Sequence, residues 1–295
     1  VFEHYAKGNK LRSEELAHDP DAVTAQVDRV IARFTPDFIA ARAMQGHSAP
    51  DPIFILGMPR AGSTLIEQIL SSHSMVEGTM ELPDIPAMAM REGRGHDGGW
   101  LDALVGMSAD NLDRLGSEFI ERTRIQRKTD KPFFIDKLPN NWSYLGFIRL
   151  ILPNAKIIDA RRHPLDCCFS NFRQHFAKGQ SFSYDLAHMG RYYADYVRAM
   201  EHWDDVQPGH VHRVIHERLL DDPEAEIRTL LGYLGLPFEE ACLAFHENKR
   251  AVRTASSEQV RRPINRDGVD QWKPYEADLG PLKAALGNLW KSYPA

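Results

Sequence analysis

The 295-residue chain has few cysteines, no long apolar run and little net charge. Its cysteines are odd in number and lack metal-ligand spacing, so neither a disulfide framework nor a structural zinc site is expected; they are Cys167, Cys168 and Cys242. No apolar stretch approaches the roughly 18–20 residues of a membrane span. A formal net charge of −5 disfavours general binding to nucleic acid or to a membrane surface. We therefore expect a cytoplasmic protein whose anion sites are local clusters of arginine.

What the chain does contain is typical of a globular protein, with 43% hydrophobic and 26% charged residues. Residues 1–50 are polar and helical in pattern, and a linker-like stretch leads from them into the main domain, residues 51–295. Apolar residues from Val23 to Phe34 recur at helical spacing. Asp21 or Thr24 is expected to cap that helix and Pro36 to end it.

Short apolar runs alternate with helical patterns through the rest of the chain. The runs cover residues 53–56, 133–136, 155–162 and 211–215. This alternation predicts an α/β, three-layer fold with a central parallel sheet flanked by helices. Functional residues are then expected at the carboxyl ends of the strands. Thr64, Lys137, Arg162 and His216 fall at such ends.

One of these strands leads into a glycine-containing loop and then a helix. This geometry directs backbone N–H groups and a helix N-terminus at one point, where a tetrahedral anion binds. Gly57 and Gly62 keep the spacing of the nucleotide-kinase loop, but Ser63 stands where its lysine belongs and Arg60 lies inside the loop. On the loop alone, two interpretations stay open: an anion site of another kind, or a glycine-rich turn without a ligand.

Three motifs in order resemble those of sulfotransferases. The segment Gly57-Met58-Pro59-Arg60-Ala61-Gly62-Ser63-Thr64-Leu65 resembles the family's 5′-phosphosulfate loop, and Arg162-His163-Pro164-Leu165-Asp166 with Ser170 resembles its 3′-phosphate motif. Residues 256–265 with Trp272 are similar to the segment that covers the cofactor in tyrosylprotein sulfotransferases. The arrangement is most similar to bacterial sulfotransferases with upstream tetratricopeptide repeats, so residues 1–50 are a candidate remnant of such a region.

The resemblance implies transfer of a sulfuryl group from 3′-phosphoadenosine 5′-phosphosulfate, leaving 3′,5′-adenosine bisphosphate. Three positions depart from the family's pattern: Ala61 replaces a serine, His216 a tyrosine and Gln271 a lysine. The residues implied to bind the donor are Arg60, Ala61, Gly62, Ser63, Thr64, Leu65, Arg162, Ser170, Gln174, His216, Ser256, Arg262, Gln271 and Trp272.

The resemblance also implies two catalytic residues. Glu81 matches the family's general base, and Lys137 matches a lysine that neutralises charge on the leaving group. Without the resemblance, each would be read as a solvated charge in a loop or at a strand end. A sulfuryl group carries less charge than a phosphoryl group, so arginine, lysine and backbone dipoles can suffice and no metal is expected.

The acceptor is left open, as is the oligomeric state. A peptide tyrosine, a saccharide, a lipid or a small-molecule hydroxyl would each fit, and loops 82–107 and 176–190 are expected to build the acceptor pocket. Two alternatives stand beside the sulfotransferase: a P-loop nucleotide kinase with a rearranged phosphate loop, and a non-catalytic nucleotide-binding module.

Several other conspicuous residues are expected to be structural. Arg161 and Arg162 are adjacent on a strand and point to opposite faces, so Arg161 is expected to form a structural ion pair. His73, His163 and His175 are expected to pack or cap rather than catalyse.

Overall fold

The computed structural model describes residues 1–177, 179–252, 254 and 256–294, and its centre is a parallel sheet. The strand order is β2-β3-β1-β4-β5, and each neighbouring pair runs parallel. The predicted α/β fold with a parallel sheet is therefore confirmed. The strands are β1 (Pro52–Gly57), β2 (Val76–Gly78), β3 (Phe133–Lys137), β4 (Lys156–Arg161) and β5 (Val211–Ile215).

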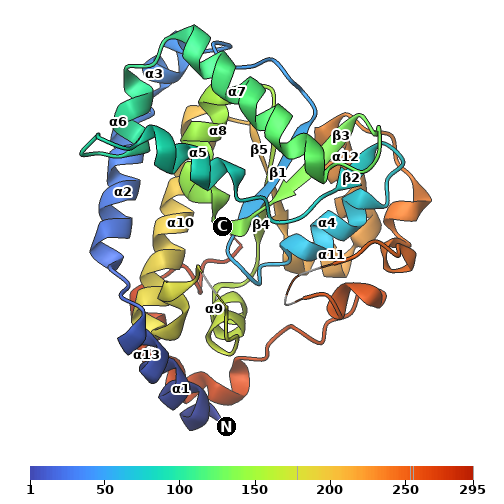
Figure 1. Cartoon of the computed structure of the whole chain (residues 1–295). Helices are drawn as coiled ribbons and strands as arrows, with labels where there is room; N and C mark the ends of the chain where they lie inside the picture. The colour runs from blue at the N-terminus through green and yellow to red at the C-terminus, as the bar shows by residue number, and fades with distance from the viewer. Residues whose placement is uncertain (178, 253, 255, 295) are drawn as a thin grey trace.

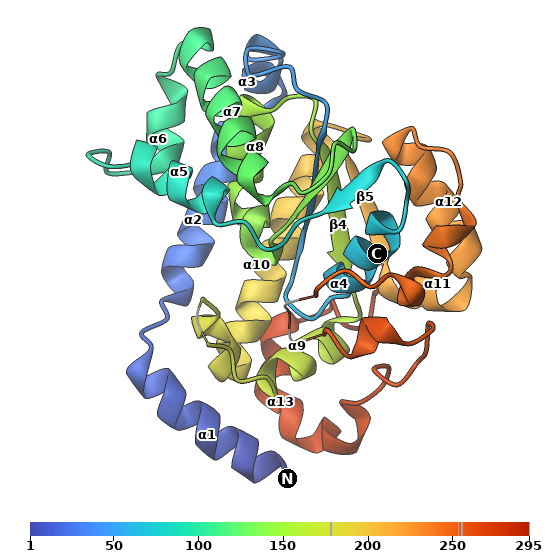
Figure 2. The same ribbon diagram turned by 45° about the vertical axis from the view of Figure 1, so that its right-hand side comes forward.

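Helices cover both faces of the sheet and complete three layers (Figures 1 and 2). Helices α8 and α10 lie on one face, and α4 and α12 lie on the other (Figure 2). The helices are α1 (Phe2–Glu15), α2 (Pro20–Arg33), α3 (Pro36–Ala41), α4 (Ser63–Ser71), α5 (Asp84–Glu92), α6 (Trp100–Val105), α7 (Ala109–Thr123), α8 (Leu145–Ile151), α9 (Pro164–Phe172), α10 (Leu186–Val206), α11 (His216–Asp221), α12 (Pro223–Leu234) and α13 (Gly280–Leu286).

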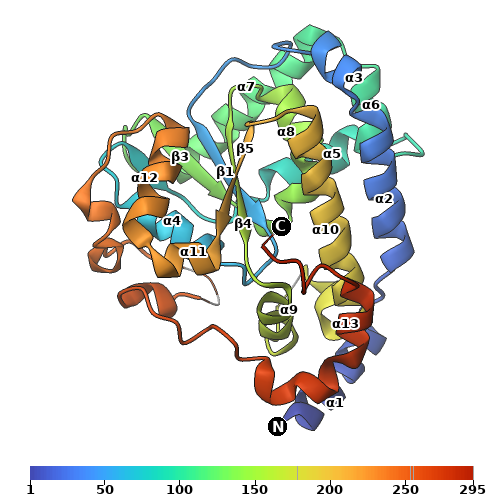
Figure 3. The ribbon, with the colours of Figure 1, turned by 180° about the vertical axis from the view of Figure 1, so that it is seen from behind.

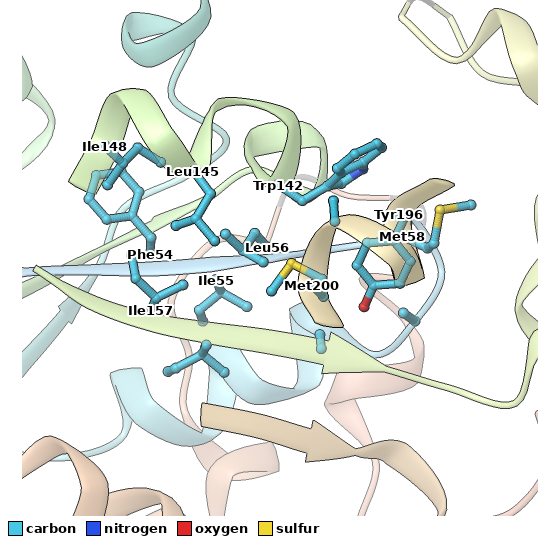
Figure 4. Close-up of a cluster of buried hydrophobic side chains, with 14 of the residues drawn as sticks. Phe54, Ile55, Leu56, Met58, Trp142, Leu145, Ile148, Ile157, Tyr196 and Met200 are labelled. Carbon is cyan, nitrogen blue, oxygen red and sulfur yellow. The ribbon is translucent and has the colours of Figure 1, made fainter. Parts of the chain in front are cut away.

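Strand β1 forms the centre of the hydrophobic core. All six of its residues are buried because helices cover both faces of the sheet. Burying one large apolar side chain of this kind contributes about 1.5–3 kcal/mol to the stability of the fold. The strand therefore gives the loop that follows it a rigid starting point. Figure 4 shows the layer that it shares with its neighbours, which includes Phe54, Leu56, Trp142, Leu145, Ile157, Tyr196 and Met200.

The first helices differ in detail from expectation. Asp19, rather than Asp21 or Thr24, caps α2: its Oδ1 accepts from the backbone N–H groups of Asp21 (2.9 Å) and Ala22 (3.1 Å). Helix α2 ends at Arg33, and Pro36 does not end it but begins α3. Proline is favoured in a first helical turn because the N–H that it lacks has no helical partner there.

Helix α2 packs along α10 (Figures 1 and 3). Thr24 Oγ1 donates to Asp195 Oδ2 at 2.7 Å, and His202 Nε2 lies 3.0 Å from the carbonyl oxygen of Phe34. The division into residues 1–50 and 51–295 stays a prediction. Within the described part of the chain, no helix is both long and apolar enough to cross a bilayer.

Two elements near the sheet's carboxyl edge also differ. Strand β2 was not expected, because its three residues include Glu77 and Gly78 and show no apolar run. The sequence from Pro164 predicts a helix to about Phe176, whereas helix α9 ends at Phe172. Figure 2 shows α9 just beyond the tip of β4. Asn171 of α9 donates to the carbonyl of Pro59, in the loop that follows β1, at 2.7 Å.

Candidate active site

The loop between β1 and α4 has a backbone that only certain residues allow. Gly57 and Gly62 have φ values of 135° and 101°. A Cβ at Gly57 would lie 2.4 Å from the carbonyl oxygen of Ala160, and one at Gly62 would lie 2.8 Å from Nδ1 of His216. Both glycines are therefore required by close approach as well as by conformation. Arg60, between them, also has a positive φ of 65°.

The same loop ends in donors that are free to bind an anion. The Gly62 carbonyl accepts from the N–H groups of Leu65 (3.0 Å) and Ile66 (3.2 Å), which starts α4. The N–H groups of Gly62, Ser63 and Thr64 donate to no acceptor among the described residues. Because they begin a nine-residue helix, they carry the positive end of its dipole.

Arg60 reaches from this loop to two distant hydroxyl groups. Its Nε donates to Ser170 Oγ at 3.1 Å, and its Nη1 donates to Ser256 Oγ at 2.5 Å. No carboxylate pairs with it among the described residues. Burial and the nearby Arg162 lower its pKa below the ordinary value. A guanidinium that stays charged in such surroundings is a binding group for an anion.

Arg162 lies beside Arg60 and is buried. It donates to the backbone carbonyls of Arg60 (3.1 Å) and Gly268, while its Nε has no partner among the described residues. Its nearest carboxylate, Asp166, is 3.8 Å away and already accepts from two backbone N–H groups. The two arginines therefore place largely uncompensated positive charge at one point.

His216, the first residue of α11, faces the same loop. Burial and the charge of Arg162 lower its pKa to about 3. Its imidazole is therefore neutral at neutral pH, so it can donate from one nitrogen and accept at the other without adding charge. It places an uncharged ring on the cavity wall at the position where the resemblance implies a tyrosine.

These groups line a cavity of about 190 Å³. Nine of the predicted donor-binding residues lie on its wall: Arg60, Gly62, Ser63, Thr64, Leu65, Arg162, His216, Ser256 and Arg262. The other residues on the wall were not among the predicted donor-binding residues, although most of them belong to the third motif. They are Leu220, Phe245, Gln259, Val260, Pro263, Ile264, Asn265, Asp267 and Gly268.

The other five predicted residues lie off the wall. Ala61 is buried, and Ser170 reaches the site through Arg60. Gln174 donates to the carbonyl of His175. Gln271 accepts from Arg173 and donates to the carbonyl of Asp267, and Trp272 stacks on His163 with ring centroids 6.0 Å apart.

The two predicted catalytic residues meet. Lys137 Nζ donates to Glu81 Oε1 at 2.6 Å. Lys137 is buried at the end of β3, and Glu81 follows β2, so neighbouring strands of the sheet deliver both. An acceptor of protons and a fixed cation at one point are what a group-transfer reaction requires.

A second, larger cavity of about 600 Å³ contains this pair. Neither of the loops expected to build an acceptor pocket, 82–107 and 176–190, contributes to its wall. That wall consists of Glu67, Ser71, residues 76–81, Gln126, Lys128, Thr129, Lys131, Lys137, Asn248, Arg250, Ala251 and Thr254. Thr64 on the first cavity and Thr254 on the second have their Oγ1 atoms 3.2 Å apart, so the two cavities are neighbours.

Arg161 and His73, both expected to be structural, make internal contacts. Arg161 pairs with Asp159 at 2.9 Å on the face opposite to Arg162. His73 is buried, with its Nε2 2.9 Å from the carbonyl oxygen of Pro237. The three cysteines are buried and unpaired, and burial raises the pKa of Cys167 to about 12.

Comparison with known proteins places this chain in a family. The sequence model of the sulfotransferase family matches residues 52–240. An uncharacterized protein from Aquifex aeolicus is 37% identical over 300 residues, covering 99% of this chain but only 39% of that protein. The chain thus spans well under half the length of this relative. Protein-tyrosine sulfotransferase 1 from Danio rerio is 27% identical over 266 residues, covering 80% of this chain and 71% of that protein.

Solved structures agree on the fold. The sulfotransferase domain from the Synechococcus PCC 7002 olefin synthase superposes with a TM-score of 0.57 at 23% identity, covering 77% of this chain and 89% of that domain. The sulfotransferase domain from the curacin biosynthetic pathway gives a TM-score of 0.55 at 18% identity, covering 81% and 98%.

Proposed function

The chain belongs to the sulfotransferase family, and we propose that it transfers a sulfuryl group from 3′-phosphoadenosine 5′-phosphosulfate to an acceptor hydroxyl. The observation that carries the proposal is the pair of arginines on one cavity wall, Arg60 and Arg162, without a closely paired carboxylate. A donor with anionic groups at its 3′ and 5′ ends supplies the negative charge that this pair lacks. Free N–H groups at the start of α4 suit the 5′ end.

The chain's residues divide into two sets around such a donor. Residues 60–65 would hold the phosphosulfate, and Arg162 with Ser170 would hold the 3′-phosphate. Ser256 and Arg262 come from the segment that covers the cavity. The unpartnered Nε of Arg162 supports the fit, because a buried guanidinium N–H without an acceptor is costly unless a ligand provides one.

Glu81 and Lys137 would perform the chemistry. The bound donor supplies the sulfuryl group and a bisphosphate leaving group. Glu81 Oε accepts the proton of the acceptor hydroxyl while the oxygen of that hydroxyl forms the new bond to sulfur. Lys137 Nζ stabilises the negative charge that grows on the bridging oxygen as the old bond breaks. Fixed electrostatic groups of this kind contribute roughly 10²–10³ in rate.

We propose that the acceptor enters through the larger cavity, because that cavity contains Glu81 and borders the donor cavity at Thr64 and Thr254. A peptide tyrosine is the first candidate, since curated relatives are named protein-tyrosine sulfotransferases. Operation without a metal and a cytoplasmic location are further proposals. The unpaired thiols of the three cysteines are compatible with a reducing compartment.

A transfer assay with a sulfur-labelled donor tests the proposal. Peptide tyrosines, saccharides and simple phenols serve as acceptors, and Glu81→Gln is the matched control. The proposal expects label on at least one hydroxyl class, and loss of that label in the control. Transfer from magnesium-ATP instead would support the kinase alternative. Donor binding without transfer to any acceptor would support the non-catalytic module.

A further inference from the structure

Arg250 lies in the wall of the larger cavity and joins three segments. Its Nη1 donates to Gln68 Oε1 at 3.2 Å, and its Nη2 donates to Glu67 Oε1 and to the carbonyl oxygen of Thr79 at 3.3 Å. Glu67 is buried in α4, so this guanidinium also neutralises a carboxylate that would otherwise be unpaired inside the protein. A planar group with several fixed donors can satisfy these acceptors together, which an ammonium cannot.

The contact with Thr79 bears directly on Glu81, two residues later. Thr79 is also held from the other side, where its Oγ1 donates to the carbonyl of Ile135, two residues before Lys137. Gly78, the residue before Thr79, packs closely against the same guanidinium, since a Cβ there would lie 2.8 Å from the Nε of Arg250. Arg250 and the carbonyl of Ile135 thus hold Thr79 from two sides, two residues before Glu81.

The backbone of Arg250 connects in turn to the segment that covers the donor cavity. Arg261 Nη1 donates to the carbonyl of Asn248 at 2.7 Å, and its Nη2 donates to the carbonyl of Arg250 at 2.6 Å. Arg261 belongs to the short helix η6 (Gln259–Arg261), whose other residues, Gln259 and Val260, line the donor cavity. Hydrogen bonds thus join residues 259–268, here called the donor cover, to Arg250 and join Arg250 to Thr79, from which two residues of backbone lead to Glu81.

We propose that Arg250 is a positioning residue that couples ordering of the donor cover, residues 259–268, to the placement of Glu81 beside Lys137. The inference rests on the proposed function, because it takes the donor cavity to bind an adenosine bisphosphate group. Arg250 itself touches no reacting atom. It holds Glu81, the general base, in place when the donor cover is ordered over a bound donor.

Hydrogen exchange tests the coupling without chemistry. Adding 3′,5′-adenosine bisphosphate to the wild-type protein is expected to slow exchange at residues 259–268 and also at residues 79–82. In Arg250→Met the first region still responds and the second does not. Absence of any response in the wild type would contradict the proposed function. Equal responses of both regions in wild type and variant would contradict only the role of Arg250.

A double-mutant cycle gives the catalytic readout. Glu81→Gln is expected to lower kcat by roughly 10²-fold or more in the wild-type background, but by less than about tenfold in Arg250→Met, because a misplaced base contributes little. The matched control is Arg213→Met. Arg213 is similarly shielded and also pairs with a buried carboxylate, that of Asp159 at 3.0 Å, but it contacts neither cavity. In that background Glu81→Gln keeps its full effect.

Two further variants keep the test decisive if Arg250→Met does not fold. Arg250→Lys retains a charge for Glu67 but cannot hold Gln68 and Thr79 as well, so it is expected to uncouple the regions partly. Arg261→Met breaks the same connection at an exposed residue and is expected to uncouple them with the Arg250 side chain intact. Full, independent effects of Glu81→Gln in both backgrounds would overturn the inference.

Discussion

The ammonium of Lys137 lies 2.6 Å from the carboxylate of Glu81, with the lysine side chain 1% exposed and the glutamate side chain 46% exposed. The pair therefore sits at a boundary: its cation is inside the protein and its anion faces the larger cavity. A buried charge with one partner is costly for stability. It is retained here, on our account, because the cation acts on the leaving group and the anion on the acceptor.

Lys137→Met should separate activity from stability. The variant replaces a buried ammonium with an apolar side chain of similar length, and the half-exposed Glu81 that it leaves can be solvated, so the melting temperature is expected to stay equal or rise. The rate of sulfuryl transfer is expected to fall by roughly 10²–10³. Thermal unfolding and kcat, measured on the same preparation, check both. A variant that melts much lower and keeps its activity would show that Lys137 is structural.

Gly62→Ala should damage the donor site through the backbone. The methyl group meets His216 Nδ1 at 2.8 Å, and a φ of 101° is strained for alanine, so a loss of about 1–3 kcal/mol in stability is expected. Weaker binding of adenosine bisphosphate should accompany it, since the N–H groups of the loop move. Gly106→Ala is the control, because a Cβ there meets nothing within 4 Å. Equal tolerance of both substitutions would contradict the close fit at Gly62.

Asp136→Asn tests a buried acid beside the catalytic strand end. Burial, with a smaller contribution from Asp84, raises the pKa of Asp136 well above the ordinary value, and neither oxygen has a partner among the described residues. The unfolded chain ionises this group above about pH 4, whereas the folded chain keeps its proton. The folded state therefore binds more protons, and the group lowers stability as pH rises towards the folded pKa.

The corresponding measurement is the free energy of unfolding of both proteins between about pH 4.5 and about pH 8. Asp136→Asn cannot ionise, so its stability relative to the wild type is expected to increase with pH. Comparing the two proteins removes the contributions of other titrating groups. A difference that stays constant across this range would mean that Asp136 ionises normally in the folded protein.

The sheet could be predicted from the sequence wherever an apolar run marked a buried strand. Strand β1, with all six residues buried, gave the clearest signal, and β2 gave none because it is short and at the sheet's edge. The glycine spacing predicted the loop because such a loop needs residues that adopt positive φ, and Gly57 and Gly62 both do so.

The site was harder to predict, because its contacts join residues far apart in the sequence. Arg60 meets Ser170 and Ser256, which are 110 and 196 positions away. No periodicity reports such a contact, and only the family resemblance brought these residues together in advance. The larger cavity was missed for the same reason, because its wall combines strand β2 with residues distant in the sequence, such as Lys128, Arg250 and Thr254.

On the proposed function, the cavity around Arg60 and Arg162 binds an adenosine 3′,5′-bisphosphate group. Calorimetric titration with that compound, beside magnesium-ATP and with Arg162→Ala as the control, tests it most directly. We expect micromolar binding of the bisphosphate, loss of that binding in Arg162→Ala and no comparable binding of ATP. Preference for ATP, or bisphosphate binding unchanged in Arg162→Ala, would contradict it.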